Sequence, residues 1–231
     1  MIPVSRDTKI SHIIFDWNGT LVDDIALAVK SVNTVLDEQW LPHIDASMYR
    51  QQFGFPVKTF YEGLGIDFNK MSFVRLIEVY LGIFNRGLNA CKLHQDAEAC
   101  FLWAANSAIP TSVLSASQQH TLNANLEHYH LDGFISHCFG LDGTEADGKF
   151  DLARRLDTVL GHPGEAALMV GDTDHDIEVA RICGWRVATV SHGHQSRERL
   201  LQYHGAVFPS LVALFEHHFP GTDMRRFANV A

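Results

Sequence analysis

Short apolar runs that end in a polar residue recur along this chain, and a stretch with helical spacing follows each of them. The runs are predicted strands at residues 10–15, 111–114, 166–170 and 185–190, with a short edge strand at 206–208. Near-continuous apolar strands that alternate with helices are typical of a parallel sheet covered by helices on both faces. The pattern therefore predicts an α/β fold with a doubly wound, Rossmann-like sheet.

The stretch between residues 24 and 93 has a different pattern, in which apolar residues recur at helical spacing. One predicted helical face begins at Ile25 and a second begins at Phe73, while residues 53–56 (Phe-Gly-Phe-Pro) predict a turn between two helices. We expect no strand in this stretch. We predict a helical cap domain at residues 23–93, inserted after the first strand of a core domain formed by residues 1–22 and 94–231, and we expect the cap to act as a lid.

Three polar residues come directly after predicted strands, namely Asp16, Ser115 and Asp172. The carboxyl ends of parallel strands meet at one edge of a sheet, and ligands bind beyond that edge. These side chains are therefore expected to converge on one site.

The residues around the first of these positions suit an anion. Asp16 begins the run Asp-Trp-Asn-Gly-Thr-Leu, in which Gly19 permits a sharp turn that brings backbone amides close to an anion. Thr20 supplies a hydroxyl that can hold the carboxylate or a phosphate oxygen. Lys149, in Asp-Gly-Lys-Phe-Asp, is a further candidate for the same site.

A second acidic run, Gly-Asp-Thr-Asp-His-Asp, begins at Gly171 and places Asp172 and Asp176 one helical turn apart. Asp174 is expected to cap the helix that follows. Acids that face one another across a sheet edge are costly unless a cation lies between them. Because the candidate ligands are all oxygens, Mg²⁺ is favoured over zinc or copper. Asp16, Asp172 and the main-chain carbonyl of Asn18 would form its site.

Composition narrows the class of partner and compartment. The 231 residues are 46% hydrophobic and carry a net charge of -9, which argues against nucleic acid or an anionic membrane as partner. The apolar runs are too short to span a bilayer, and the first seven residues lack the layout of a signal peptide. The four cysteines form no C-x-x-C pair and are expected to be reduced thiols. We predict a cytoplasmic protein that is a monomer or a weak homodimer.

Four motifs in order resemble those of the haloacid dehalogenase superfamily. They are D-x-x-G-T-L after the first strand, Ser115 after the second, the downstream Lys149, and G-D-T-x-x-D after the fourth. The helical insert resembles the type-one cap of the phosphoglycolate phosphatase-like group. The resemblance implies a magnesium-dependent phosphatase that acts on a small phosphorylated metabolite, a phosphate monoester, and in which Asp16 forms an aspartyl-phosphate.

The same resemblance implies roles for individual residues. Ser115 and Lys149 would hold the transferring phosphoryl oxygens, with Gly19, Thr20 and Ala116 also binding substrate. Asp16, Asn18 and Asp172 would bind Mg²⁺, supported by Asp176 and Thr173. Stabilising the charge of the phosphoryl group is most of the catalytic task in such a site.

Asn18 departs from the family pattern, which places a second Asp two residues after the nucleophile as general acid and base. An amide cannot deliver a proton, and general acid–base catalysis typically contributes ~10²–10⁴-fold. The loss matters less for leaving groups that depart without a proton, such as acyl, aryl or enol phosphates. One hypothesis is a phosphatase of reduced or specialised rate in which a neighbour such as His175 partly replaces the acid.

Two other hypotheses follow from the same departure. A carbon–phosphorus (phosphonoacetaldehyde-type) hydrolase also lacks the second Asp and uses a cap lysine as a Schiff base, a role that Lys58 would fill. Alternatively, the chain is a catalytically weakened phosphate-binding or regulatory protein on an enzyme scaffold. Retention of Asp16, Lys149 and Asp172 together argues against such decay. Dehalogenation is disfavoured, because dehalogenases do not use the metal that an acidic fourth motif serves.

Overall fold

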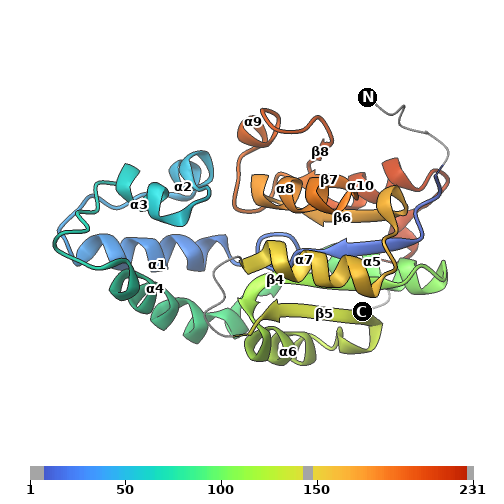
Figure 1. The fold of residues 1–231 in the computed structure, drawn as a ribbon, viewed down its shortest axis with the longest axis horizontal. Helices are drawn as coiled ribbons and strands as arrows, with labels where there is room; N and C mark the ends of the chain where they lie inside the picture. Colours follow the sequence, from blue (N-terminus) through green and yellow to red (C-terminus); the bar gives the residue numbers. More distant parts are fainter. Residues whose placement is uncertain (1–7, 143–147, 228–231) are drawn as a thin grey trace.

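The computed structural model of the chain describes residues 8–142 and 148–227. Its main feature is a six-stranded sheet in the order β5-β4-β1-β6-β7-β8 in which every paired strand is parallel (Figure 1). The strands are β1 (His12–Phe15), β4 (Thr111–Gln118), β5 (Ile135–Leu141), β6 (Ala167–Gly171), β7 (Arg186–Val190) and β8 (Val207–Phe208). The prediction of a parallel α/β fold is confirmed.

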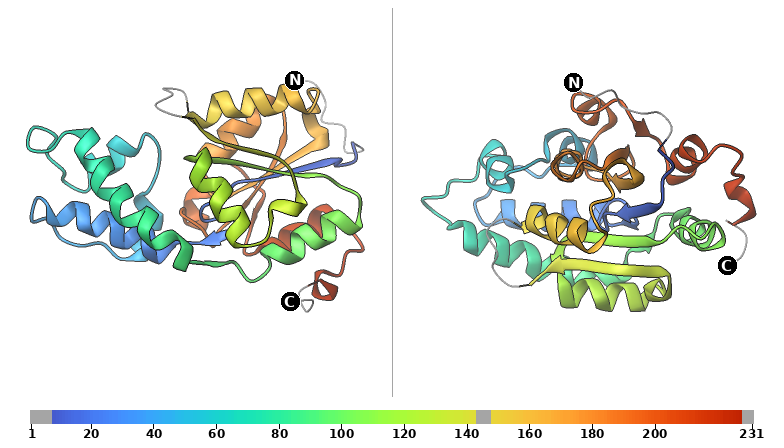
Figure 2. Two further views of the ribbon diagram at one scale, coloured as in Figure 1. Left: turned by 90° about the horizontal axis from the view of Figure 1, so that it is seen from below. Right: turned by 45° about the vertical axis from the view of Figure 1, so that its right-hand side comes forward.

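Helices cover both faces of this sheet (Figure 2). They are α5 (Ala97–Asn106), α6 (Gln119–His128), α7 (Gly148–Val159), α8 (Asp174–Cys183), α9 (Arg197–Leu200) and α10 (Leu211–His218). Because side chains alternate along a strand, Ile14 of β1 packs in one apolar cluster with α7 and α8. Its neighbours Ile13 and Phe15 pack in the other cluster, with α5 and α10. Apolar residues on both faces of β1 thus bury the strand that carries Asp16 at its end.

The strands of the six-stranded sheet differ from the predicted ones at β5 and at β4. Strand β5 was not expected, because its sequence mixes Ser136, His137 and Gly140 with apolar residues and its position at the sheet edge leaves it only partly buried. Strand β4 runs past Ser115 to Gln118, with an irregularity between Leu114 and Gln118. From the sequence, Ser117 is a candidate N-cap for the helix that follows this strand. That expectation is wrong, because β4 continues to Gln118 and helix α6 begins after it.

Four helices lie between β1 and α5 in the sequence, and we call them the cap: α1 (Ile25–Asp37), α2 (Ala46–Gln52), α3 (Val57–Gly63) and α4 (Phe73–Gly87). The predicted face of α1 is buried, and Leu76 and Phe84 of α4 are buried opposite it. Ser72 starts α4 by accepting a hydrogen bond from the Arg75 amide. The turn predicted at residues 53–56 does separate α2 from α3.

Two short strands join the cap to the core. Strand β2 (Val22–Asp23) pairs antiparallel with β3 (Lys92–Leu93), so the two chain connections run side by side. The expectation that residues 24–93 contain no strand is therefore wrong at residues 92–93, where pairing with β2 supplies hydrogen bonds that the sequence pattern does not reveal. The division into a core and a cap domain at residue 23 stays a prediction.

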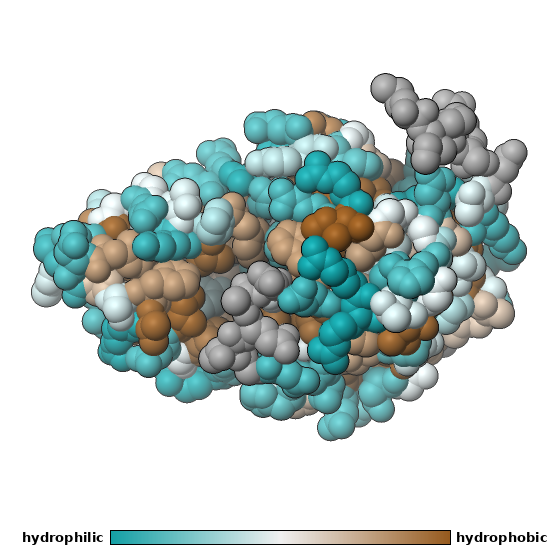
Figure 3. All heavy atoms as spheres, viewed as in Figure 1, coloured by the Kyte–Doolittle hydropathy of each residue, from teal (hydrophilic) through white to brown (hydrophobic). Residues whose placement is uncertain are grey.

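The surface is mostly hydrophilic in the view of Figure 3, with apolar patches over both the cap and the core and a hollow where the cap meets the core. Short one-turn 3₁₀ segments complete the described chain, at Leu88–Ala90, Asp132–Phe134, Gly164–Ala166 and Met224–Arg226. The four cysteines are free thiols, as expected. Within the described ranges, every helix is too short or too polar to cross a membrane.

A buried histidine at the start of β1 makes stability depend on pH. His12 is 6% exposed, its Nε2 lies 2.8 Å from Ser112 Oγ in a hydrogen bond, and burial together with nearby His137 lowers its pKa to about 4. The unfolded chain binds this proton near the ordinary value of about 6.5. The contribution of neutral His12 is thus present above pH 6.5 and is lost as the pH falls toward 4.

We expect the wild type to lose free energy of unfolding between pH 6.5 and pH 4, and His12→Gln to lose less over that interval. Urea unfolding at a series of pH values measures this slope. His120→Gln, at an exposed position on α6, is the matched control and should keep the wild-type slope. An unchanged slope in His12→Gln would contradict the assignment.

Candidate active site

Asp16 lies at the carboxyl end of β1, in the middle of the sheet. Its backbone amide donates to the Val170 carbonyl of β6 at 2.9 Å, and the residue is 8% exposed. Strand pairing places the end of β1 beside the ends of β4 and β6. The structure thus brings Asp16 to the same edge as Ser115 and Asp172, where the sequence placed all three.

Lys149, near the start of α7, is buried and bridges two carboxylates. Its Nζ donates to Asp16 Oδ1 at 2.5 Å and to Asp176 Oδ1 at 2.6 Å. The second oxygen of Asp176 accepts from the amides of Asp172 and Thr173 and from the Thr173 hydroxyl. Asp176 therefore ties down the loop after β6 and also positions the lysine.

The cap of α8 differs from the predicted one. Thr173 is the N-cap residue, and its amide and hydroxyl both bond to the Asp176 carboxylate. Asp174, the predicted cap, is instead the first helical residue, and its carboxylate accepts from Gln195 Nε2 and Arg199 Nη2. Gln195 lies in the loop after β7 and Arg199 lies in α9, and the sequence pattern did not connect either residue to α8.

Asp172 is completely buried at the end of β6 and is held by the nucleophile loop, which we define as residues 16–21. Thr20 Oγ1 donates to Asp172 Oδ1 at 2.7 Å, and the His194 amide donates to Oδ2 at 2.6 Å. Gly19 has a φ of +73°, and a Cβ there would lie 2.4 Å from Asp172 Oδ2 and 2.3 Å from the His194 ring. A side chain at position 19 would therefore force these groups apart.

The charges of this cluster are unbalanced. Burial raises the pKa of Asp16 to about 7, with Asp176 and Asp172 adding to the effect while Lys149 opposes it. Burial likewise raises the pKa of Asp172 to about 6. The charge of His194 opposes this rise, and the charge of Asp176 adds to it. Burial would also raise the pKa of Asp176, but the bonded Lys149 holds it below its ordinary value. The single positive charge of Lys149 thus does not balance the negative charges of the three carboxylates.

The same three carboxylates fit a divalent cation. One oxygen from each of Asp16, Asp172 and Asp176 lies within 4.8 Å of the others, and all three residues are buried. The donors are oxygens, which Mg²⁺ prefers. The raised pKa values of Asp16 and Asp172 also mark a site whose ionised carboxylates need more positive charge than the chain supplies. The residues present therefore fit the ion that the sequence predicted.

Ser115 and Ala116 follow one another in β4 beside the nucleophile loop. Ser115 is 1% exposed, and its Oγ accepts from the Ser117 amide at 3.1 Å; Ala116 is exposed. Ser117 Oγ in turn donates to Asn18 Oδ1 at 2.8 Å. The contact from β4 to the nucleophile loop is thus made by Ser117, which the sequence analysis had assigned to a helix cap.

The Asn18 side chain is held at both ends. Its Oδ1 accepts from Ser117, and its Nδ2 donates to Asp24 Oδ2 at 2.7 Å. Asp24 Oδ1 also accepts from the Gly19 amide at 3.1 Å. Asp24 is completely buried at the start of α1, so the chain carries a carboxylate next to the amide that stands in the acid–base position.

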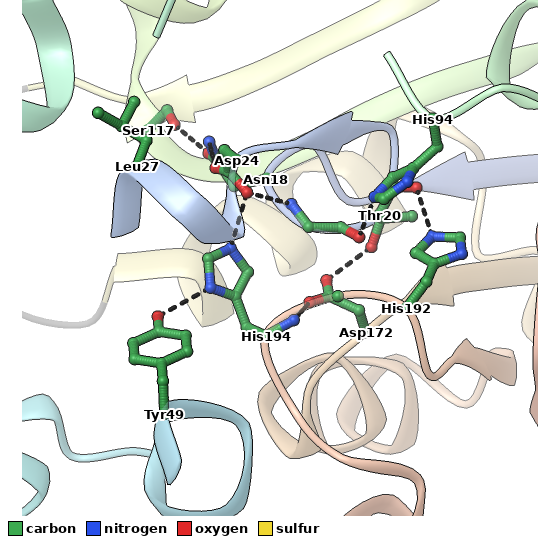
Figure 4. Close-up of polar contacts among 12 residues, drawn as sticks. Asn18, Thr20, Asp24, Leu27, Tyr49, His94, Ser117, Asp172, His192 and His194 are labelled. Carbon is green, nitrogen blue, oxygen red and sulfur yellow. Dashed lines mark hydrogen bonds and ion pairs between the residues drawn. The ribbon is translucent and has the colours of Figure 1, made fainter. Parts of the chain in front are cut away.

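His194, in the loop after β7, connects Asp24 to the cap (Figure 4). Its Nε2 lies 3.1 Å from Asp24 Oδ1, close enough for an ion pair although the geometry is not that of a directed hydrogen bond. Its Nδ1 lies 2.8 Å from the Tyr49 hydroxyl of α2. Burial would lower the pKa of His194, but Asp24 and Asp172 outweigh it and raise the pKa to about 9.

Two more histidines hold the backbone of the nucleophile loop from the other side. His94 Nε2 lies 3.2 Å from the Gly19 carbonyl, and His192 Nε2 lies 3.2 Å from the Thr20 carbonyl (Figure 4). Their rings are 3.8 Å apart. His94 follows β3, so this pair also joins the loop to the base of the cap.

The surroundings of His175 and Lys58 do not match the catalytic roles considered for them from the sequence. The His175 ring stacks on Phe55 at 4.5 Å and meets the edge of Phe150 at 4.6 Å. Burial, with Lys149 nearby, lowers the His175 pKa to about 4, so it is a poor proton donor at neutral pH. Lys58 is exposed and its Nζ lies over the Phe68 ring at 5.1 Å. Neither arrangement favours the role that was considered for the residue.

Sequence reasoning missed Asp24, Tyr49, Ser117 and the three histidines of this site. From the sequence, the pair Asp23–Asp24 is expected only to start the first helix of the insert, and Asp24 does directly precede α1 in the structure. The distant contacts leave no spacing signal, because His194 lies 145 positions from Tyr49 and 170 from Asp24. The one sequence signal for this half of the site is the presence of a carboxylate, Asp24, six residues after the amide of Asn18.

Comparison with known proteins agrees with this geometry. The chain is 26% identical over 204 residues to the pyrophosphatase PpaX of Anoxybacillus flavithermus, covering 84% of this chain and 90% of that protein. It is 24% identical to the phosphoglycolate phosphatase of Aquifex aeolicus, covering 89% and 97%. The structure of a protein named as a predicted phosphatase, from Clostridium acetobutylicum, superposes with a TM-score of 0.74 at 24% identity, covering 91% and 97%.

A family model supplies the assignment. The model described as haloacid dehalogenase-like hydrolase matches residues 13–190, which include the nucleophile loop, Ser115, Lys149 and Asp172. The chain therefore belongs to the haloacid dehalogenase-like hydrolase family, as its motifs predicted.

Proposed function

We propose that the chain is a magnesium-dependent phosphatase that acts on a small phosphorylated metabolite through an aspartyl-phosphate at Asp16. The observation that carries the proposal is the enclosed cluster in which Asp16 meets Lys149 and lies near Asp172 and Asp176. The names of the relatives, a pyrophosphatase and a phosphoglycolate phosphatase, support phosphoryl transfer.

The side chains divide the reaction between them. Lys149 occupies Asp16 Oδ1, so Oδ2 is the oxygen that would attack phosphorus; the Oδ2–P bond forms as the bond from phosphorus to the leaving oxygen breaks. Lys149 and Ser115 would bind phosphoryl oxygens. Water then attacks the aspartyl-phosphate, releasing inorganic phosphate and restoring Asp16. A bound Mg²⁺, held by Asp16, Asp172 and the Asn18 carbonyl, would supply charge neutralisation.

The surroundings of Asn18 favour substrates whose leaving group needs no proton. Its amide is held between Asp24 and Ser117 and has no proton to give at neutral pH. We therefore propose acyl, aryl or enol phosphates, or pyrophosphate, as the substrate class. Alkyl phosphates should react more slowly, by the ~10²–10⁴-fold that general acid catalysis contributes.

A panel of phosphate esters tests this proposal. We expect phosphate release from acetyl phosphate, p-nitrophenyl phosphate and pyrophosphate with Mg²⁺, none in EDTA, and kcat/KM for 2-phosphoglycolate lower by about 10²-fold or more. Substrates that differ in leaving-group pKa but not in size separate proton delivery from fit. Equal kcat/KM across the panel would contradict the assignment of Asn18, and full activity in EDTA would contradict the metal.

A further inference from the structure

Tyr49 stands at the cap end of a continuous set of polar contacts that ends in the nucleophile loop. The Tyr49 hydroxyl bonds to His194 Nδ1 at 2.8 Å, and His194 Nε2 lies 3.1 Å from Asp24. Asp24 accepts from the Asn18 side chain and from the Gly19 amide. Figure 4 shows these side chains pointing toward one another from three separate parts of the chain.

Helix α2 is docked on the core next to these contacts. Arg50 Nε and Nη2 donate to the carbonyls of Gly193 and His192, at 2.9 and 3.0 Å. The Ser196 amide donates to the Arg50 carbonyl, and Gln195 Nε2 donates to the Phe53 carbonyl. The contact of Tyr49 with His194 therefore depends on α2 lying against residues 192–196.

The hydroxyl of Tyr49 has a role that is separable from the packing of its ring. The residue is 1% exposed, and its ring packs on Phe53 and Phe60 at centroid distances of 5.0 and 5.8 Å. Those contacts need only a phenyl ring. A buried hydroxyl is costly without a partner, and His194 supplies that partner.

The His194 ring connects Tyr49 to the nucleophile loop by direct contact. It lies against Gly19, where a Cβ would come within 2.3 Å of its Cδ2 atom. The contact leaves no space for the ring to move toward the loop without displacing it. Asp24, held by His194 on one side, fixes Asn18 and the Gly19 amide on the other.

We propose that Tyr49 is a positioning residue of the active site, and that it acts through His194 and Asp24 to hold Asn18 and Gly19 in place when α2 is docked on the core. The cap thereby takes part in forming the nucleophile loop as well as covering it. The kinetic part of this inference rests on the proposed phosphatase function; the structural part does not.

Tyr49→Phe tests the inference, with Tyr61→Phe as its matched control. Tyr61 is a buried cap tyrosine of α3 that lies outside these contacts. With p-nitrophenyl phosphate and Mg²⁺ we expect Tyr49→Phe to lower kcat about tenfold with KM within about twofold, because a misplaced reacting group slows the chemical step. Tyr61→Phe should keep kcat within about twofold.

A double-variant comparison asks whether the effect passes through Asp24. Serine at position 24 is shorter than aspartate and carries no charge, so it removes the ion pair with His194, and because the Asp24 side chain makes no cap hydrogen bond to α1, no helix cap is lost. In the Asp24→Ser background, Tyr49→Phe should therefore have little further effect on kcat. A tenfold loss that persists in that background, or an equal loss in Tyr61→Phe, would overturn the inference.

Hydrogen exchange gives a readout that needs no turnover. The Gly19 amide donates to Asp24 Oδ1 and to the Val22 carbonyl, so loosening Asp24 should expose it. We expect faster exchange of the peptide covering residues 16–24 in Tyr49→Phe and wild-type exchange in Tyr61→Phe. Unchanged exchange in Tyr49→Phe would overturn the inference. Absence of phosphatase activity in the wild type would instead contradict the proposed function and leave this comparison valid.

Discussion

Asp16→Asn is expected to abolish phosphate release, lowering kcat by at least about 10⁴-fold, because an amide oxygen cannot displace the leaving group and form the acyl phosphate bond. The substitution keeps the size of the side chain and its oxygen facing Lys149. Release of inorganic phosphate from acetyl phosphate with Mg²⁺ measures the loss. Asp132→Asn, which removes one charge at an exposed position far along the chain, is the control and should retain wild-type kcat.

Asp16→Asn should not lower the stability of the metal-free protein. The pKa of Asp16 is raised to about 7, so the folded state binds that proton more tightly than the unfolded chain does. Charged Asp16 therefore destabilises the fold as the pH rises through the interval from 3.8 to 7. At pH 8 in EDTA we expect a higher melting temperature for Asp16→Asn than for the wild type. A lower one would mean that lost activity reflects lost structure.

The fold and the acidic half of the site followed from sequence because each depends on a local pattern. Asp16, Ser115 and Asp172 come after buried apolar runs, and parallel pairing brings such positions to one edge. Strand β5 was missed because only part of it is buried and its apolar pattern is interrupted. Lys149, near the start of α7, could be placed in the site only by the family resemblance, since the sequence around it carries no pattern that points to the sheet edge.

The other half of the site could not be predicted, because its residues are joined only in three dimensions. Tyr49 lies on a cap helix and His194 in a loop of the core, and neither stands at a strand end. The structure alone shows that both approach Asp24. It also changes the interpretation of Asn18. In the sequence, Asn18 stands where the family has an acid, and in the structure its side chain is hydrogen-bonded to the carboxylate of Asp24.

This contact changes what Asn18→Asp should do. A carboxylate introduced at position 18 would face Asp24 across the 2.7 Å that now separates an amide nitrogen from an oxygen. Two like charges at that distance repel, and the repulsion is strong because Asp24 is completely buried. We therefore expect the single variant to melt below the wild type and to gain little activity, although it restores the family residue.

The exchange variant Asn18→Asp/Asp24→Asn is expected to recover what the single variant loses. It keeps the net charge and allows the same hydrogen bond to form with donor and acceptor reversed, since the amide at position 24 can donate to the new carboxylate. A carboxyl group at position 18 can then deliver a proton to the leaving oxygen. We expect kcat/KM for 2-phosphoglycolate to rise about 10²-fold over the wild type, and that for p-nitrophenyl phosphate to rise less than about tenfold.

Leaving-group dependence decides between proton delivery and a general improvement of the site. If the exchange variant gained equally with alkyl and aryl phosphates, the new carboxyl group would be acting on binding or loop position. If the single variant gained as much as the exchange variant, Asp24 would not be restricting position 18. A gain confined to the poor leaving group, and seen only when Asp24 is also replaced, would show that this site departs from its family through two linked residues, Asn18 and Asp24.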